Sequence, residues 1–122
     1  MKATEILTGA GQSVRFYPAL REIAGGTIPA ILLGQLLYWT GSDSIEGGWI
    51  YKNHKDIEEA TGLSLHEQLE ALTKLRKSNL LTEWWDRDAH KIYMRVNTDI
   101  VQIALYHLQD DADNLSVVYR KG

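Results

Sequence analysis

The segment that most constrains the fold runs from Lys55 to Arg95, and its first half has the pattern of two helices joined by a tight turn. Thr61-Gly62-Leu63-Ser64 lies between two stretches of helical periodicity, where glycine allows the chain to change direction sharply. Ser64 and Glu67 have the spacing of a capping box, which satisfies free backbone N–H groups at a helix start. The segment therefore predicts a helix-turn-helix whose second helix begins after Ser64.

The second of these helices is predicted to end near Asn79, since asparagine tolerates the left-handed conformation common at helix ends. Four leucines recur along it at helical spacing and are predicted to form its inward stripe: Leu65, Leu69, Leu72 and Leu75. The side chains left for its other faces are His66, Glu67, Gln68, Glu70, Thr73, Lys74 and Lys77. The expected core joins residues of several elements, namely Ile31, Leu32, Leu36, Trp39, Ile57, Leu63, Leu69, Leu72, Leu75, Ile92 and Met94.

A two-stranded hairpin is predicted directly after the second helix. Leu80-Leu81 leads into one strand, Asp86-Arg87-Asp88 forms a turn, and Lys91 to Val96 alternates as the returning strand. Trp49 to Lys52 predicts a further short strand, just before Asn53, the expected cap of the first helix. Two helices followed by a hairpin is the order of elements in a winged helix, whose second helix usually enters the DNA major groove.

The residues before this segment predict two further helices. A short helix begins at Tyr17-Pro18 and ends at Gly25-Gly26, because proline suits a first helical turn and glycine a helix end. Thr27 is the predicted N-cap of the next helix, which runs from Ala30 to Trp39 and is apolar on most faces. We expect this helix at the centre of the core.

The 122 residues are expected to form a single domain, with a winged-helix core over residues 17–97 and an irregular N-terminus over residues 1–16. Thr98 is the predicted cap of a C-terminal helix over residues 98–109, and residues 110–122 are expected to be an acidic tail that frays or adds a short strand. The predicted fold class is mainly α with a small antiparallel sheet (α+β): a winged helix with two extra N-terminal helices and a C-terminal helix.

Three stretches of the chain carry a resemblance to a known group of proteins: YPALREIAGGTIPAILLGQLLYWTG, GGWIYKNHKDIEEATGLSLHEQ and LTKLRKSNLLTEWWDRDAHKIYMRVN. Together, over residues 16–97, they resemble the N-terminal winged-helix domain of phage and mobile-element replication proteins, the replisome-organiser and DnaD-like group. The most specific parts are residues 35–39, 48–52 and 61–68. The resemblance implies binding to DNA near a replication origin or in a phage gene cluster, often alongside a further C-terminal assembly domain.

Charge and hydropathy limit the other possibilities. Thirteen Lys and Arg against sixteen Asp and Glu give a net charge of −3, so the chain as a whole is not drawn to nucleic acid or to an anionic membrane. The N-terminus lacks the apolar core of a signal peptide, and the longest apolar run, Ile28 to Trp39, is too short to span a bilayer. We therefore expect a cytoplasmic protein with no membrane partner.

Neither a catalytic centre nor a cofactor is predicted. The chain has no phosphate-binding glycine loop, no H-E-x-x-H motif and no nucleophile elbow. There is no cysteine, and the histidines at positions 54, 66, 90 and 107 do not have metal-ligand spacing. The expectation is a protein that is not an enzyme and holds neither metal nor cofactor.

Candidate DNA-binding residues come from both helices of the helix-turn-helix and from the hairpin. Gln68 suits an adenine edge and His66 a base or a phosphate, while the lysines suit the phosphate backbone. The full set is His54, Lys55, His66, Gln68, Thr73, Lys74, Lys77, Arg87, His90 and Lys91. These residues would act in replication initiation or in transcriptional regulation.

A protein partner is the main alternative, because residues 52–95 contain equal numbers of basic and acidic side chains. Neighbouring strand residues point to opposite faces, so one of Trp84 and Trp85 is expected to pack inward and the other to be exposed. The alternative interface is Glu58, Glu59, Glu70 and Trp85, for a host or phage protein that this chain inhibits or recruits, as in counter-defence.

A small assembly module is the third hypothesis. Residues 98–109 carry more apolar side chains than one helical stripe needs: Ile100, Val101, Ile103, Ala104, Leu105 and Leu108. We therefore expect a homodimer formed through this helix.

Overall fold

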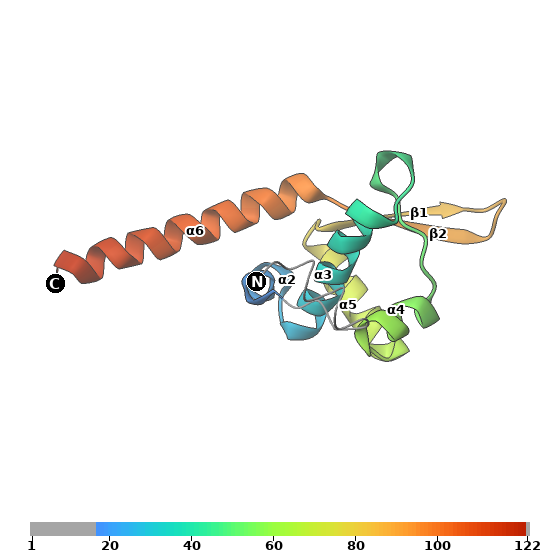
Figure 1. The fold of residues 1–122 in the computed structure, drawn as a ribbon, viewed down its shortest axis with the longest axis horizontal. Helices are drawn as coiled ribbons and strands as arrows, with labels where there is room; N and C mark the ends of the chain where they lie inside the picture. Colours follow the sequence, from blue (N-terminus) through green and yellow to red (C-terminus); the bar gives the residue numbers. More distant parts are fainter. Residues whose placement is uncertain (1–16, 122) are drawn as a thin grey trace.

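The computed structural model describes the backbone of residues 17–121 and the side chains of residues 17–109. The expected irregular N-terminus, residues 1–16, lies outside the described residues. The described chain is mostly helical with a small antiparallel sheet, which confirms the α+β class (Figure 1). Its elements are α2 (Pro18–Ala24), α3 (Thr27–Ser42), the 3₁₀ helix η1 (Glu46–Gly48), α4 (His54–Thr61), α5 (Leu65–Lys77), β1 (Leu81–Asp86), β2 (Lys91–Val96) and α6 (Thr98–Lys121).

Helix α3 forms the centre of the core, as predicted. Leu32, Leu33 and Leu36 are fully buried, and α2 and α5 pack against this helix. The prediction of Thr27 as N-cap is wrong, because the cap is Gly26 with no side-chain bond, and Thr27 is already helical. Gly25 ends α2 in the left-handed conformation, and α3 begins two residues later at Thr27. The residue between them, Gly26, is therefore the N-cap and has no side chain to bond the helix start.

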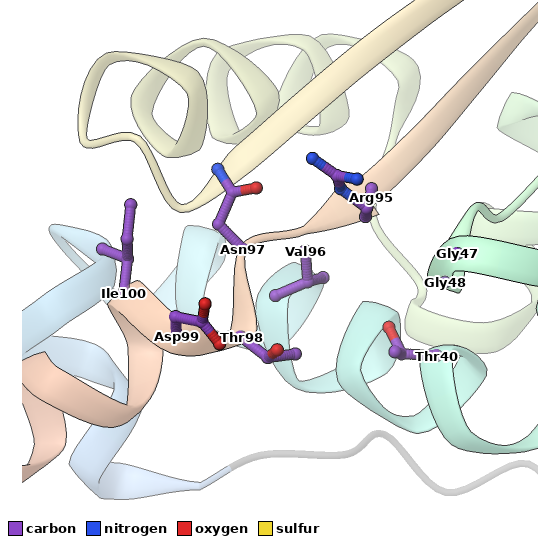
Figure 2. A pocket seen from close by; sticks show the side chains of 9 residues that line it. All are labelled: Thr40, Gly47, Gly48, Arg95, Val96, Asn97, Thr98, Asp99 and Ile100. Atoms are coloured by element: carbon purple, nitrogen blue, oxygen red, sulfur yellow. The ribbon is translucent and has the colours of Figure 1, made fainter.

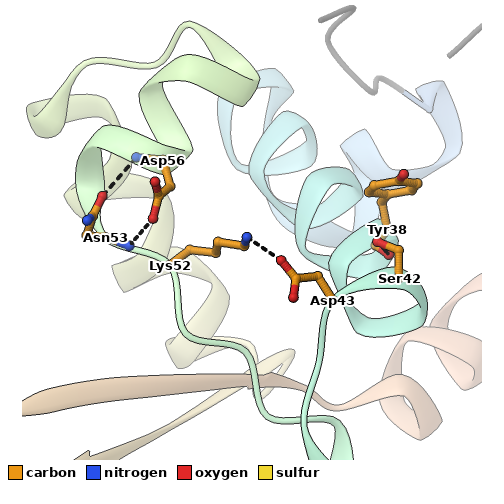
Figure 3. Close-up of polar contacts among 6 residues, drawn as sticks. All are labelled: Tyr38, Ser42, Asp43, Lys52, Asn53 and Asp56. Atoms are coloured by element: carbon orange, nitrogen blue, oxygen red, sulfur yellow. Dashed lines mark hydrogen bonds and ion pairs between the residues drawn. The ribbon is translucent and has the colours of Figure 1, made fainter. Parts of the chain in front are cut away.

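Both helices of the predicted helix-turn-helix begin with a complete capping box. In α4 the Asn53 side chain accepts from the backbone N–H of Asp56, and Asp56 accepts from that of Asn53 (Figure 3). Ser64 and Glu67 make the same reciprocal pair at the start of α5, which confirms the predicted box. Gly62 ends α4 with a φ of 78°, and this left-handed residue makes the sharp turn between the helices possible.

The strands β1 and β2 form a two-stranded antiparallel hairpin in which Leu81 pairs with Val96 and Trp85 with Ile92. Asn79 has a φ of 59° between α5 and β1, as expected for a left-handed helix end. The predicted strand at residues 49–52 is reduced to isolated bridges, Ile45 with Trp49 and Ile50 with Met94. Gly47 and Gly48, both at positive φ, bend the preceding chain, so only Ile50 reaches hydrogen-bonding register with β2.

Helix α6 is longer than predicted. It continues to Lys121, so residues 110–121 belong to this helix and form neither a separate tail nor a short strand. Thr98 is its first residue, and Asn97 precedes it. Val101 is buried and Leu105 packs against the core, whereas the rest of the helix runs away from the body on the side opposite to the hairpin (Figure 1).

The inward face of α5 differs from the predicted leucine stripe. Gln68, Ala71 and Leu75 are buried, Leu72 is half-buried, and Leu65 and Leu69 are exposed. Of the expected core, Ile92 is also exposed, Ile31 is partly buried, and the remainder is buried as predicted. Helix α5 packs against α3 and buries Gln68, Ala71 and Leu75, and this orientation leaves Leu65 and Leu69 facing outward.

Within residues 17–121 no helix is by itself both long and apolar enough to cross a membrane. Helices α2 and α3 meet that description only when taken together, across a bend of 110°.

Candidate functional site

The exposed side of α5 gathers several of the predicted DNA-binding residues. His66, Thr73, Lys74 and Lys77 line a shallow hollow of about 540 Å³ together with Leu69 and Glu70. We call these six residues the outer face of α5. His66 Nε2 lies 3.2 Å from a carboxylate oxygen of Glu70, one helical turn away, and both side chains are largely exposed. Four predicted contact residues therefore share one accessible helix face.

Gln68 does not belong to that face, and its assignment to a base edge is wrong. The residue is 2% exposed. Its side-chain Nε2 donates to the backbone oxygens of Leu63, at 2.9 Å, and of His54, at 3.0 Å. Both amide protons are used inside the protein, which leaves none for a ligand.

Several acidic side chains around α5 are engaged locally. The carboxylates of Asp56 and Glu67 accept backbone hydrogen bonds at the starts of α4 and α5, where the positive end of the helix dipole partly offsets their charge. Glu83 pairs with Arg76 at 2.7 Å, and Asp86 accepts from the backbone of Ala89 in the hairpin turn. Within the described side chains, those of Glu58, Glu59 and Asp88 have no such partner, and all three are exposed.

Several cations around the same elements are not neutralised by a carboxylate. Lys55 and Lys77 make no ion pair with any described residue, and Lys74 Nζ lies 3.4 Å from the carbonyl oxygen of Gly25. Arg87 lies over the ring of Trp85, 5.1 Å from its centroid. Lys52 differs, because it pairs with Asp43 at the end of α3 (Figure 3).

A groove of about 390 Å³ separates α5 from the hairpin. Its apolar residues are Tyr51, Ile57, Leu65, Leu69, Leu72, Ile92 and Met94, and we call them the α5–hairpin groove. Leu69 is 55% exposed, and Leu65 and Ile92 are exposed to a similar degree. His54, His90 and Lys91, three of the predicted DNA-binding residues, stand at the rim of this groove rather than on the outer face of α5.

Both tryptophans of β1 are exposed, so the expectation that one of them packs inward is wrong. They do lie on opposite faces: Trp85, 57% exposed, pairs with Ile92, and Trp84, 48% exposed, pairs with Tyr93. The hairpin extends beyond the body, so neither of its faces is fully covered near the tip (Figure 1). The alternation of strand residues indicated the two faces but not how far the hairpin would project.

A second hollow, of about 490 Å³, lies where β2 passes into α6. Figure 2 shows that its residues come from the end of α3, the turn at Gly47-Gly48, the end of β2 and the first turn of α6. Arg95 and Asp99 are its charged members. Among the described residues, no group of three or more His, Cys, Asp or Glu side chains is placed to hold a metal ion.

Comparison with known proteins finds no match for this chain among protein-family models, curated proteins or solved structures.

Proposed function

We propose that this protein is a winged-helix DNA-binding protein that contacts duplex DNA with the outer face of α5 and the hairpin tip. The order α4, Gly62 turn, α5 and hairpin is the order that this fold uses. The resemblance over residues 16–97 supports a phage or mobile-element origin and a role in replication initiation or transcriptional regulation. The proposal includes a cytoplasmic location and no catalytic activity.

The distribution of unneutralised cations carries this proposal. Lys55 stands on the first turn of α4, Lys74 and Lys77 on the last turns of α5, and Arg87 in the turn of the hairpin. Asp56 and Glu67 are held in capping boxes and Glu83 in an ion pair. Glu58 and Glu59 near Lys55, and Asp88 beside Arg87, are exposed without such a partner, so positive charge is least opposed at Lys74 and Lys77 on the last turns of α5. Phosphates spaced along a duplex are suitable partners for such an arrangement.

Because Gln68 is buried, we propose that other residues of α5 contact the bases. His66 is exposed on the first turn of α5, and Thr73 follows two turns later on the same face. Leu69 lies between them, and its exposed methyl groups suit the methyl group of thymine in the major groove. Lys55, Lys77 and Arg87 would hold the phosphates on either side.

Binding to a random duplex at salt concentrations from roughly 50 to 200 mM tests the proposal. We expect affinity to fall steeply with salt, and Lys77→Gln to flatten the slope by about one unit. Lys77→Arg is the matched control, because it keeps the charge and should keep the slope. A wild-type protein that fails to bind any duplex at 50 mM salt contradicts the proposal.

A protein partner is the second candidate, and the exposure of Leu65, Leu69 and Ile92 in the α5–hairpin groove favours it. A DNA-reading surface rarely needs so much apolar area, whereas an interface core does. The expected partner is a host or phage protein retained after nuclease treatment. Its capture should be lost in Leu65→Asp or Trp85→Ala and in variants of Glu58, Glu59 or Glu70. Capture that instead depends on Lys77 and on intact DNA excludes this candidate.

A further inference from the structure

The face of the hairpin that carries Trp84 and Tyr93, opposite to the face of Trp85 and Ile92, has a continuous row of aromatic rings. Trp84 and Tyr93 are direct partners in the register, and their rings stack with centroids 5.1 Å apart and planes 26° apart. The ring of Trp49 continues the row, with its centroid 6.0 Å from that of Trp84. The ring of Tyr51 extends the other end, with its centroid 5.7 Å from that of Tyr93. We call these four residues the aromatic row.

The aromatic row is at the surface. Trp84 and Tyr51 are exposed, and Trp49 and Tyr93 are half-buried. Stabilising the hairpin accounts for the contact between Trp84 and Tyr93, since cross-strand aromatic pairs stabilise antiparallel strands. It does not account for two further rings from the preceding segment, which extend the same row along the surface.

A cation stands at each end of the aromatic row. The Arg95 guanidinium lies 4.8 Å from the centroid of the Trp49 ring, and Lys91 Nζ lies 4.9 Å from that of Tyr51. Neither cation forms an ion pair with a carboxylate of the described residues. Asp86 is opposite Lys91 in the register, and its carboxylate accepts a hydrogen bond from the backbone N–H of Ala89 in the turn. Glu83, next to Trp84 on β1, pairs with Arg76.

We infer that the aromatic row binds single-stranded nucleic acid, with bases stacked on the exposed rings of Trp84 and Tyr51 and phosphates held by Arg95 and Lys91. Exposed rings beside cations are the combination that single-strand binding proteins use. A duplex does not suit this surface, because its bases already cover one another's faces. The inference is independent of the duplex proposal, which rests on the outer face of α5 and on Arg87 at the hairpin tip. Tyr51 and Lys91 lie where the aromatic row meets the α5–hairpin groove.

Titration of a fluorescent twelve-nucleotide oligo(dT), with an oligo(U) of equal length in parallel, tests the inference. Trp84→Leu should weaken binding by about tenfold or more, because it removes one stacking platform. Arg95→Gln should reduce the salt slope by about 0.7 unit, the value for one phosphate of a single strand. If these substitutions weaken binding of oligo(dT) only, the ligand is single-stranded DNA. If they weaken binding of both oligonucleotides equally, the ligand is either nucleic acid.

Trp85→Leu is the matched control, because it removes an exposed tryptophan next in the chain but on the opposite face of the hairpin. We expect it to leave oligonucleotide affinity unchanged, and Lys77→Gln to do the same. Circular dichroism checks that Trp84→Leu folds. Tyr51→Leu, outside the strands, provides a second variant that should also weaken binding. Absence of wild-type binding at 50 mM salt, or equal losses in Trp84→Leu and Trp85→Leu, overturns the inference.

Discussion

The side chain of Gln68 joins α5 to the start of α4, because its Nε2 donates to the backbone oxygen of His54 at 3.0 Å. The same nitrogen bonds the backbone oxygen of Leu63, in the turn between the two helices, at 2.9 Å. One buried amide therefore bonds a carbonyl group in the first turn of α4 and another in the turn that follows α4, and it holds α4, the turn and α5 in one arrangement.

Gln68→Leu should lower the free energy of unfolding by about 1–3 kcal/mol, since two buried hydrogen bonds, to the backbone oxygens of His54 and Leu63, are lost. Urea denaturation followed by circular dichroism measures this change. Gln102→Leu, at an exposed position of α6, is the control and should stay within about 0.5 kcal/mol of wild type. A stable Gln68→Leu protein with altered base preference would restore the assignment of this residue to DNA.

Leu75→Ala and Leu69→Ala separate the observed orientation of α5 from the leucine stripe predicted from the sequence. Leu75 is fully buried, so its truncation should cost about 2–5 kcal/mol. Leu69 is exposed, so the same change there should cost less than about 1 kcal/mol. Thermal or urea unfolding of both variants measures the difference, and equal costs would mean that α5 is rotated relative to the core described above.

Ser64→Ala should destabilise the protein by about 1 kcal/mol, because the Ser64 side chain accepts from the backbone N–H of Glu67 at the start of α5. Ser78→Ala is the matched control at the other end of the same helix, where no side-chain cap bond is made by the serine. Urea unfolding compares the two. Equal effects would show that the loss reflects the serine-to-alanine change itself rather than the capping box.

We propose that the homodimer predicted from the sequence forms through the exposed apolar side chains of α6, which are Ile100, Ile103 and Tyr106. Val101 and Leu105 face the core, so Ile100, Ile103 and Tyr106 are left for a second copy. We expect a dimer by sedimentation at tens of micromolar and a shift toward monomer in Ile103→Asp. Gln102→Asp adds the same charge beside it and should change association less. A wild-type protein that is monomeric throughout would remove this interface and the assembly-module hypothesis with it.

Local signals predicted the elements well. The Ser64–Glu67 box, the Gly62 turn and the positive φ of Asn79 depend on residues close in sequence, and each occurs as expected. The orientation of α5 was not predictable in this way. Leucine is more hydrophobic than glutamine or alanine, so a hydrophobic pattern predicts that the leucines of α5 face inward rather than Gln68 and Ala71. In the structure Gln68 and Ala71 are buried, and burial of the glutamine is tolerated because its amide is hydrogen-bonded.

The candidate site was predicted only in part. His66, Thr73, Lys74 and Lys77 share one face because they recur on a helix, and that periodicity is visible in the sequence. The aromatic row was missed because it joins Trp49 and Tyr51, from the segment before α4, to Trp84 and Tyr93 on the hairpin. The bridge from Ile50 to Met94 brings them together, and no local pattern specifies that long-range register.

Asn97 connects three elements at the place where α6 leaves the body. Its Nδ2 donates to the backbone oxygen of Asn79 at 2.7 Å, its Oδ1 accepts from the Thr82 hydroxyl at 3.1 Å, and its backbone N–H donates to Leu80. Val101 and Leu105 hold the first two turns of α6 against the core, and the remaining residues, 106–121, extend roughly 24 Å beyond them at about 1.5 Å per residue. We expect a load on the far end of α6 to be borne first by Val101 and Leu105 and then to reach the base of the hairpin through the hydrogen bonds of Asn97, worth about 1 kcal/mol each.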